Sequence, residues 1–375
     1  MEKLKLMTIM GTRPEIIRLS SIIKCADKYF NHVVVHTGQN WDKNLNDIFY
    51  EDLDLRTPDY YLDSVGKNLG ETMGNIISKS YDILLKEQPD AVLILGDTNS
   101  ALSAISAKRL KIPIFHMEAG NRCWDWNVPE MINRAIVDRI SDINLPYTEH
   151  SRRYLLSEGV DGKTIFVTGS PMAEVLHNQK DKIEKSTVIS ELKLKKGGYF
   201  LLSAHREENI DNEENFLSLM TAVNNIAEKY QKPVLYSMHP RSKNIIERRG
   251  FKFNSLVKSF KPFGFSDYVN LQKNSFCVLS DSGTLSEESA ILNFPAVQIR
   301  TSTERPEVLD KGAIIIGGIT KKDIEQAIDI SVAMHKNNEK VVLVPDYQDL
   351  NVSTKIVKII QSYAKIINET VWRKF

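Results

Sequence analysis

The stretch AVLILGDTNS, from Ala91 to Ser100, shows how this chain is built. Five apolar residues, a length typical of a buried strand, run directly into a glycine, and Asp97 follows at the strand's carboxyl end. Thr98 or Asn99 can then cap a helix, so the pattern predicts a strand that leads into a helix. The same alternation recurs along almost the whole sequence. It predicts an α/β protein whose parallel sheets are built from βαβ units.

The expected strands fall into two groups. In the first half they cover residues 6–10, 32–36, 91–95, 112–116, 143–145 and 165–168, and in the second half 199–203, 234–237, 276–279, 296–299 and 313–316. Residues 71–85 and 353–367 carry apolar side chains at helical spacing, which predicts two helices that each pack one face on the protein.

The length of the chain predicts two domains, because 375 residues exceed what one hydrophobic core usually serves. Residues 181–196 are rich in Lys, Glu and Ser and low in aromatic residues, as expected of a surface connection. We therefore expect an N-terminal domain over 1–180 and a C-terminal domain over 181–352. A closing helix within 353–375 should pack back on the N-terminal domain.

The composition excludes several classes of protein. Hydrophobic residues make up 42% and charged residues 26%, as in a soluble globular protein, and a net charge of +1 gives no bulk attraction to nucleic acid or to an anionic membrane. The three cysteines form no C-x-x-C pair and no H-E-x-x-H motif is present, so neither a disulfide framework nor a metal site is expected. Without a signal peptide or an apolar run of bilayer length, the expected location is the cytoplasm.

Polar motifs follow the strands of the first half. Arg13, in GTRPE, is either an anion contact or a solvated arginine of an ordinary turn. Asp97 can serve as a helix cap, but Glu118 also ends a strand, and two strand-end carboxylates favour chemistry. Pro129 should begin a helix with Glu130 in its first turn and Arg134 on the next. Dipole compensation by Glu130 and an exposed Arg134 are the structural alternatives.

Two motifs stand out in the second half. His205, in SAHREEN, follows a strand and is a candidate for acid–base chemistry or phosphate contact, although a lone histidine is often structural. The run Ser280-Asp281-Ser282-Gly283-Thr284 opens a helix with hydroxyls and backbone N–H groups that suit a pyrophosphate, where a plain N-cap is the alternative. The G-x-G-x-x-G, P-loop and G-x-S-x-G patterns are all missing from the sequence.

Taken together, GTRPE, HTGQN, GDTNS, HMEAGNR, VPEMINR, SAHREEN, SDSGTLSEE and TSTERPE resemble the non-hydrolysing UDP-N-acetylglucosamine 2-epimerase family. The resemblance implies two Rossmann-like domains that face each other across a cleft, as in B-type glycosyltransferases, with UDP held by the C-terminal domain. It also implies a homodimer, a UDP-sugar substrate, and no cofactor or metal. The implied reaction eliminates UDP, passes through a 2-acetamidoglycal, and adds UDP back after C2 is reprotonated on its other face.

Carried over by position, the resemblance assigns two sets of residues. The catalytic residues it implies are Asp97, Glu118, Glu130 and His205. The UDP-sugar contacts it implies are Arg13, Arg18, Arg122, Arg134, Tyr268, Ser282, Gly283, Thr284, Glu288 and Arg305.

Several positions depart from the glucosamine enzymes. Arg18 replaces a usual lysine, Asn40 a histidine and Thr284 a glycine, and the loop before Glu130 is shorter. The combination resembles the subfamily that makes UDP-N-acetyl-L-fucosamine from UDP-2-acetamido-2,6-dideoxy-L-talose for capsule or O-antigen. The alternatives are UDP-N-acetylglucosamine as substrate, a B-type glycosyltransferase, and a non-catalytic nucleotide-sugar binding protein.

Overall fold

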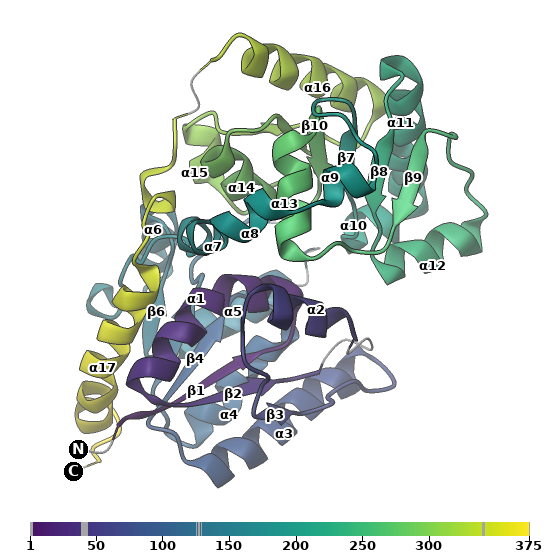
Figure 1. The fold of residues 1–375 in the computed structure, drawn as a ribbon. Helices are drawn as coiled ribbons and strands as arrows, with labels where there is room; N and C mark the ends of the chain where they lie inside the picture. The colour runs from purple at the N-terminus through teal and green to yellow at the C-terminus, as the bar shows by residue number, and fades with distance from the viewer. Residues whose placement is uncertain are drawn as a thin grey trace. The chain divides into compact units, whose positions relative to one another are not determined.

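The computed structural model describes residues 3–38, 44–124, 126, 128, 130–339 and 342–374, with only the backbone of 44–47. It divides into two compact units (Figure 1). The first unit comprises Met1–Asn178 and Asp346–Phe375, and the second comprises Gln179–Pro345. Each unit is built on one six-stranded parallel sheet with helices, so the α/β prediction is confirmed.

The sheet of the first unit has the Rossmann strand order, β3-β2-β1-β4-β5-β6. Its chain order reverses between β1 and β4, and loops that leave this switch point are where ligands of such sheets bind. The strands are β1 (Lys5–Met10), β2 (Asn31–His36), β3 (Tyr60–Tyr61), β4 (Ala91–Leu95), β5 (Ile114–Met117) and β6 (Ile143–Leu145). The helices are α1 (Arg13–Tyr29), α2 (Asn44–Asp52), α3 (Leu69–Glu87), η1 (Asn99–Leu102), α4 (Ser103–Arg109), α5 (Glu130–Ile140), α6 (Glu149–Ser157), η2 (Gly162–Thr164), α7 (Met172–Asn178) and α17 (Val352–Thr370).

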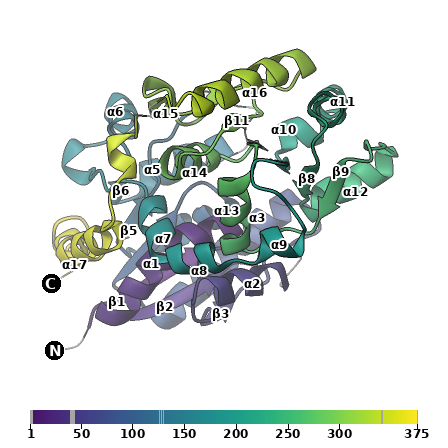
Figure 2. The same cartoon turned by 45° about the horizontal axis from the view of Figure 1, so that its top comes forward.

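The C-terminal helix α17 packs against α1 of this first unit, as both ribbon views show (Figures 1 and 2). Its apolar face buries Ile356, Ile360 and Ile367. Asn351 gives no side-chain cap at its start. Instead, the carboxylate of Glu174, on α7, accepts the backbone N–H of Ser353 at 2.8 Å, which satisfies one of the free donors of the first turn.

The second unit repeats the same strand order. Its sheet runs β12-β11-β10-β7-β8-β9, with the switch point between β7 and β10. The strands are β7 (Phe200–Ser203), β8 (Val234–Ser237), β9 (Val257–Phe260), β10 (Cys277–Ser280), β11 (Ala296–Gln298) and β12 (Ile315–Ile316). The helices are α8 (Lys180–Lys185), α9 (Val188–Glu191), α10 (Glu207–Ile210), α11 (Glu213–Tyr230), α12 (Pro240–Arg249), α13 (Phe265–Asn274), α14 (Leu285–Leu292), α15 (Pro306–Asp310) and α16 (Lys321–Lys336), and η3 (Pro345–Tyr347) lies at the boundary of the units.

One strand prediction is wrong. Residues 165–168 form a single bridge, Asn144 to Ile165, rather than a strand. Phe166 and Thr168 donate to the carbonyls of Asn144 and Pro146, both at 3.0 Å. Pro146 has no N–H to return a hydrogen bond, so the ladder cannot continue. Residues 181–196, expected as a surface connection, contain the short helix α9 and most of α8.

No helix in the described part of the chain is both long and apolar enough to cross a bilayer.

Candidate active site

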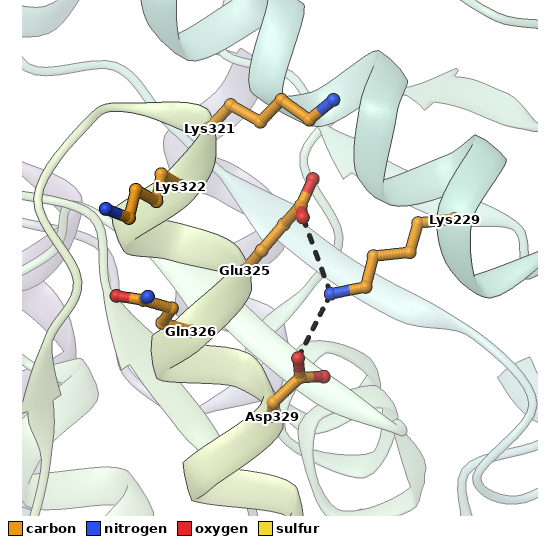
Figure 3. Close-up of a pocket in the computed structure, with 6 residues that line it drawn as sticks. All are labelled: Lys229, Lys321, Lys322, Glu325, Gln326 and Asp329. Carbon is orange, nitrogen blue, oxygen red and sulfur yellow. Dashed lines mark hydrogen bonds and ion pairs between the residues drawn. The ribbon is translucent and has the colours of Figure 1, made fainter.

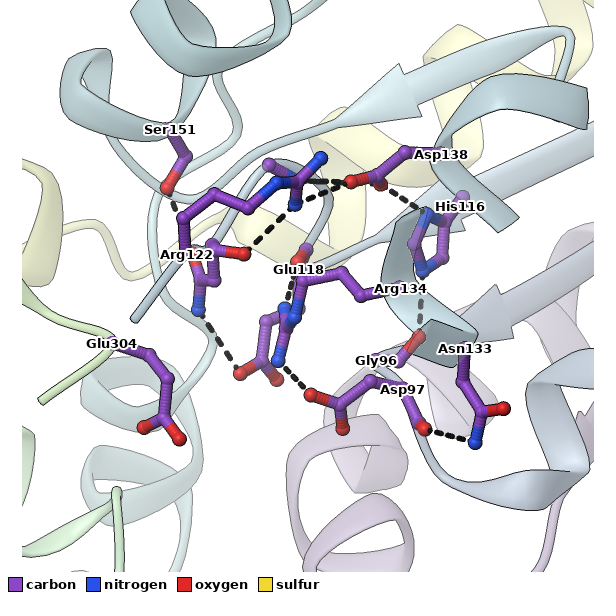
Figure 4. A network of polar contacts seen from close by, with 12 residues as sticks. Gly96, Asp97, His116, Glu118, Arg122, Asn133, Arg134, Asp138, Ser151 and Glu304 are labelled. Atoms are coloured by element: carbon purple, nitrogen blue, oxygen red, sulfur yellow. Dashed lines mark hydrogen bonds and ion pairs between the residues drawn. The ribbon is translucent and has the colours of Figure 1, made fainter. Parts of the chain in front are cut away.

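Asp97 lies two residues beyond β4, at the switch point of the first sheet. Thr98 caps the following turn η1, accepting the N–H of Ser100 at 3.3 Å, so the interpretation of Asp97 as a cap is wrong. The Asp97 carboxylate instead forms an ion pair with the guanidinium of Arg134 (Figure 4). The ion pair orients this carboxylate. The Asp97 side chain is also partly exposed to solvent, as a group that reacts with a substrate must be.

Glu118 follows β5 directly and adopts a left-handed backbone conformation, with φ of +60°. Such a conformation costs a non-glycine residue about 1–2 kcal/mol, and it persists at sites where the surrounding contacts fix it. The Glu118 N–H donates to Leu145 at 3.1 Å, and its side chain contacts Arg18 and accepts Asn121 Nδ2 at 3.2 Å. The carboxylate is therefore held at both oxygens.

Arg134 joins these two strand ends from helix α5. One guanidinium nitrogen pairs with Asp97 and the other donates to the backbone carbonyl of Glu118 at 2.9 Å. Only 3% of Arg134 is exposed, so the alternative of a solvated arginine is wrong. Glu130 begins α5 and is half-buried. Pro129 lies outside the described residues, as does Asn40.

The other predicted arginines of this unit differ in their surroundings. Arg13 begins α1, and its guanidinium lies 5.9 Å from the centre of the Phe49 ring. Arg18 is buried one turn later and lies 6.0 Å from the Tyr147 ring. Arg122 is held by two carboxylates, Asp138 at 2.8 Å and Glu158 at 2.7 and 2.8 Å. These acids raise the pKa of Arg122 although its burial opposes the rise.

In the second unit, Asp281 joins the carboxyl ends of β7 and β10. It is fully buried, and its Oδ2 accepts the backbone N–H groups of His205 and Arg206, both at 2.9 Å, and Asn209 Nδ2 at 3.2 Å. Its other oxygen lies 3.4 Å from His205 Nδ1. The imidazole of His205 is partly exposed, so it is available to a ligand at the switch point of this sheet.

The residues from Ser282 to Thr284 turn into α14 beside two guanidinium groups. The hydroxyls of Ser282 and Thr284 lie 3.0 Å apart. A Cβ placed on Gly283 would lie 3.8 Å from both Arg206 Nη2 and Arg305 Nε, which locates both cations next to this turn. Hydroxyls, a helix start and arginines together make a site suited to phosphate groups.

The other residues of this unit that were predicted to contact the UDP-sugar are Arg305, Glu288 and Tyr268. Arg305 forms a buried ion pair with Glu287. Glu288 accepts Gln272 Nε2 at 2.6 Å. Tyr268 is half-buried, and its burial, with the charge of Glu288, raises the pKa of its phenol. Each is fixed at or near the start of α14 or on the neighbouring helix α13.

Known proteins are similar to this chain in sequence and fold over its whole length. The family model described as UDP-N-acetylglucosamine 2-epimerase matches residues 24–361. The chain belongs to this family. A solved UDP-N-acetylglucosamine 2-epimerase from Rickettsia bellii is 45% identical, with a TM-score of 0.91 over 100% of both chains. Another, from Methanocaldococcus jannaschii in complex with UDP-GlcNAc and UDP, is 35% identical, with a TM-score of 0.89 over 96% of this chain and 100% of that one.

A relative that is named for a different sugar also matches this chain. The UDP-2,3-diacetamido-2,3-dideoxy-D-glucuronate 2-epimerase of Pseudomonas aeruginosa is 33% identical, over 88% of this chain and 92% of its own length. The protein is a UDP-sugar 2-epimerase, an isomerase with two Rossmann-like domains. The comparisons do not single out the L-fucosamine subfamily.

Sequence reasoning did not single out three buried residues of this epimerase, Glu15, His116 and Asp138. Each carried a signal in its spacing. Glu15 lies three residues after Thr12, which is the spacing of a capping box. His116 lies two residues before Glu118, and Asp138 lies one helical turn after Arg134.

A charged depression lies elsewhere on the second unit of the epimerase, between α11 and α16 (Figure 3). Lys229 Nζ lies 3.0 Å from Asp329 and 3.4 Å from Glu325, so its cation is already neutralised. None of its lining residues belongs to the strand-end clusters. They are Lys229, Lys321, Lys322, Glu325, Gln326 and Asp329.

Proposed function

We propose that the protein inverts C2 of a UDP-linked 2-acetamido sugar by eliminating UDP and adding it back, through a 2-acetamidoglycal. The observation that carries this proposal is the pair of carboxylates at neighbouring strand ends, Asp97 and Glu118, each in contact with a buried arginine. Two fixed carboxyl groups suit a reaction that removes a proton from one face of C2 and delivers one to the other.

The chemistry explains why phosphate contacts matter as much as a base. The proton on C2 is not activated by a neighbouring carbonyl, so the C1–O bond must break first and develop oxocarbenium character. UDP then carries the negative charge that leaves with that bond, and groups that stabilise it lower the barrier. We assign this role to the turn of Ser282 and Gly283 with Arg305, and acid–base or phosphate contact to His205.

We propose UDP-2-acetamido-2,6-dideoxy-L-talose as the substrate and UDP-N-acetyl-L-fucosamine as the product, for capsule or O-antigen synthesis. Arg18 supports this choice, because a planar guanidinium in place of a lysine holds the Glu118 carboxylate differently. Thr284 adds a hydroxyl that contacts Ser282 where the glucosamine enzymes have glycine. The shortened loop before Glu130 would reshape the sugar side of the site for a 6-deoxy L-sugar.

UDP-N-acetylglucosamine, giving UDP-N-acetylmannosamine, is the second candidate. The names of the relatives from Rickettsia bellii and Methanocaldococcus jannaschii favour it. The relative from Pseudomonas aeruginosa is named for a different sugar at nearly the same identity as the archaeal enzyme, so family membership leaves the sugar open.

The deciding experiment follows C2 by NMR with each sugar in heavy water. We expect deuterium at C2 and the L-fuco product from the L-talose compound, without any added acceptor. Exchange with UDP-N-acetylglucosamine alone would replace the proposed substrate, and exchange with neither sugar would overturn the C2 chemistry. Asp97→Asn and Glu118→Gln should lose exchange while UDP still binds. The homodimer expected from the family resemblance would be tested by light scattering of the same sample.

A further inference from the structure

A buried histidine and aspartate lie directly behind the strand ends that carry Asp97 and Glu118. His116 is on β5 and Asp138 is on α5, and both are almost completely buried. The reaction as proposed does not use either side chain. His116 nevertheless contacts Gly96, the residue next to Asp97 (Figure 4). Asp138 contacts Gly120, two residues after Glu118.

His116 joins the two strand ends. Its Nε2 lies 2.7 Å from the carbonyl oxygen of Gly96, the residue immediately before Asp97. A carbonyl can only accept, so Nε2 carries a proton. On the other side of the ring, Nδ1 lies at an ion-pair distance of 2.9 Å from Asp138 Oδ1. This contact links strand β5 to helix α5.

Asp138 continues the connection beyond His116. Its carboxylate accepts the backbone N–H of Gly120, two residues after Glu118, at 3.1 Å, and pairs with Arg122 at 2.8 Å. Burial by itself would raise the pKa of Asp138, but the contact and charge of His116 and the charges of Arg122 and Arg134 outweigh it and lower that pKa. A carboxylate with these partners is charged, and it needs its cations because an unpaired buried charge is very costly.

We propose that His116 and Asp138 form a positioning unit for the epimerase reaction. The imidazole connects the end of β4 to α5, and Asp138 connects α5 to the turn after β5. Asp97 and Glu118 are thereby fixed relative to each other. The inference rests on the proposed roles of Asp97 and Glu118, and it makes His116 and Asp138 positioning residues that do not touch the substrate.

The alternative is a buried histidine that only stabilises the fold. Asp142 supplies a matched control, since it is also buried, accepts the N–H of Ile114 at 3.0 Å and pairs with Lys108 at 2.6 Å. Asp142 accepts a backbone N–H at the amino end of β5, whereas Asp138 accepts one just after its carboxyl end. A general loss of stability would lower the activity of both variants, but a loss of positioning would lower only that of the Asp138 variant.

The test compares Asp138→Asn, His116→Gln, their double variant and Asp142→Asn by steady-state kinetics of C2 epimerisation. We expect Asp138→Asn to lower kcat by about 10²-fold, the size that a displacement of about 1 Å produces, with KM and UDP binding unchanged. The double variant should lose no more than the worse single variant, because the two residues act as one unit. Asp142→Asn should keep the parent kcat.

Parent-like kcat in a folded Asp138→Asn, or an equal loss in Asp142→Asn, would overturn the inference. If the variants do not fold, the ¹⁵N spectrum of the parent still decides, because Nε2 of His116 should carry the proton that is donated to the Gly96 carbonyl. A ring with no proton on Nε2 would refute the proposal. If the parent enzyme exchanges the C2 proton of neither sugar, the proposed function is refuted instead. The spectrum of His116 would still test the hydrogen bond to Gly96 independently of that result.

Discussion

Replacing Glu15 by glutamine should change the way in which the stability of the first unit depends on pH. Glu15 is in the first turn of α1, and only 1% of it is exposed. Its carboxyl accepts Gly11 N at 3.1 Å, Thr12 Oγ1 at 2.6 Å and Thr98 Oγ1 at 3.2 Å. Burial raises its pKa from 4.5 to about 7, and these hydrogen bonds limit the rise.

The magnitude and the sign follow from that pKa. Since a tenfold change in a proton-binding constant corresponds to about 1.4 kcal/mol, the ionised carboxyl costs the folded state roughly 3 kcal/mol relative to the unfolded chain. The folded state holds its proton more tightly than the unfolded state between pH 4.5 and about pH 7. The free energy of unfolding should therefore be fully retained below pH 4.5, fall as the pH rises through this window, and level off above it.

Glutamine removes the titration without removing the contacts. Its oxygen can accept from Gly11 and Thr12, while its amide nitrogen donates to Thr98, whose hydroxyl can also accept. All four tryptophans of the chain, Trp41, Trp124, Trp126 and Trp372, belong to the first unit, so tryptophan fluorescence in urea follows the unfolding of that unit alone.

The measured quantity is the difference in unfolding free energy between Glu15→Gln and the parent, taken from pH 4.5 to 7.5. We expect it to grow in favour of the variant by roughly 3 kcal/mol. Glu149→Gln is the control, because Glu149 is also in the first turn of a helix of this unit but has an exposed side chain. A difference that stays constant with pH, or one that Glu149→Gln reproduces, would refute the reasoning.

Three further predictions concern other contacts of the first unit. Gly120→Ala should cost more than about 2 kcal/mol, because φ is +79° and a Cβ would lie 2.4 Å from the carbonyl oxygen of Ser151. Gly159→Ala, at φ +81° with no atom within 4 Å, should cost clearly less in the same denaturation assay. Glu174→Ala should cost about 1 kcal/mol and speed hydrogen exchange in the first turn of α17; unchanged exchange would contradict the cap. Arg134→Lys should lower C2 exchange by about 10²-fold, because an ammonium group cannot hold both strand ends, and parent-like exchange would exclude that role.

The sequence predicted some strands with their observed bounds and missed others. β4 and β8, which lie inside their sheets, have the predicted bounds, and so does β6 at one edge of the first sheet. β3 and β9 were missed. β3 has only two residues, and β9 reads VKSF with two exposed positions, since an edge strand has no neighbour on one side and needs no continuous apolar run.

The same physics limited the prediction of the site. Parallel strands end at one edge of a sheet, so the positions of Asp97 and Glu118 after β4 and β5 could be read from the sequence. Their partners could not be read, because Arg18 and Arg134 reach them from helices 100 and 37 residues away in the chain. The left-handed conformation of Glu118 also has no sequence signal, since glutamate rarely adopts it.

The anchoring of helix α5 would let the loop before Glu130 change in length while Asp97 and Glu118 stay in place. Glu130, Arg134 and Asp138 are spaced four residues apart, so they lie along one face of the helix. Arg134 and Asp138 fasten that face to the backbone at Glu118 and Gly120, on the near side of the loop. Both ends of the segment between Gly120 and Glu130 are therefore anchored independently of its length. Its length can vary between relatives without moving Asp97 or Glu118, and differences in sugar specificity are expected to concentrate there.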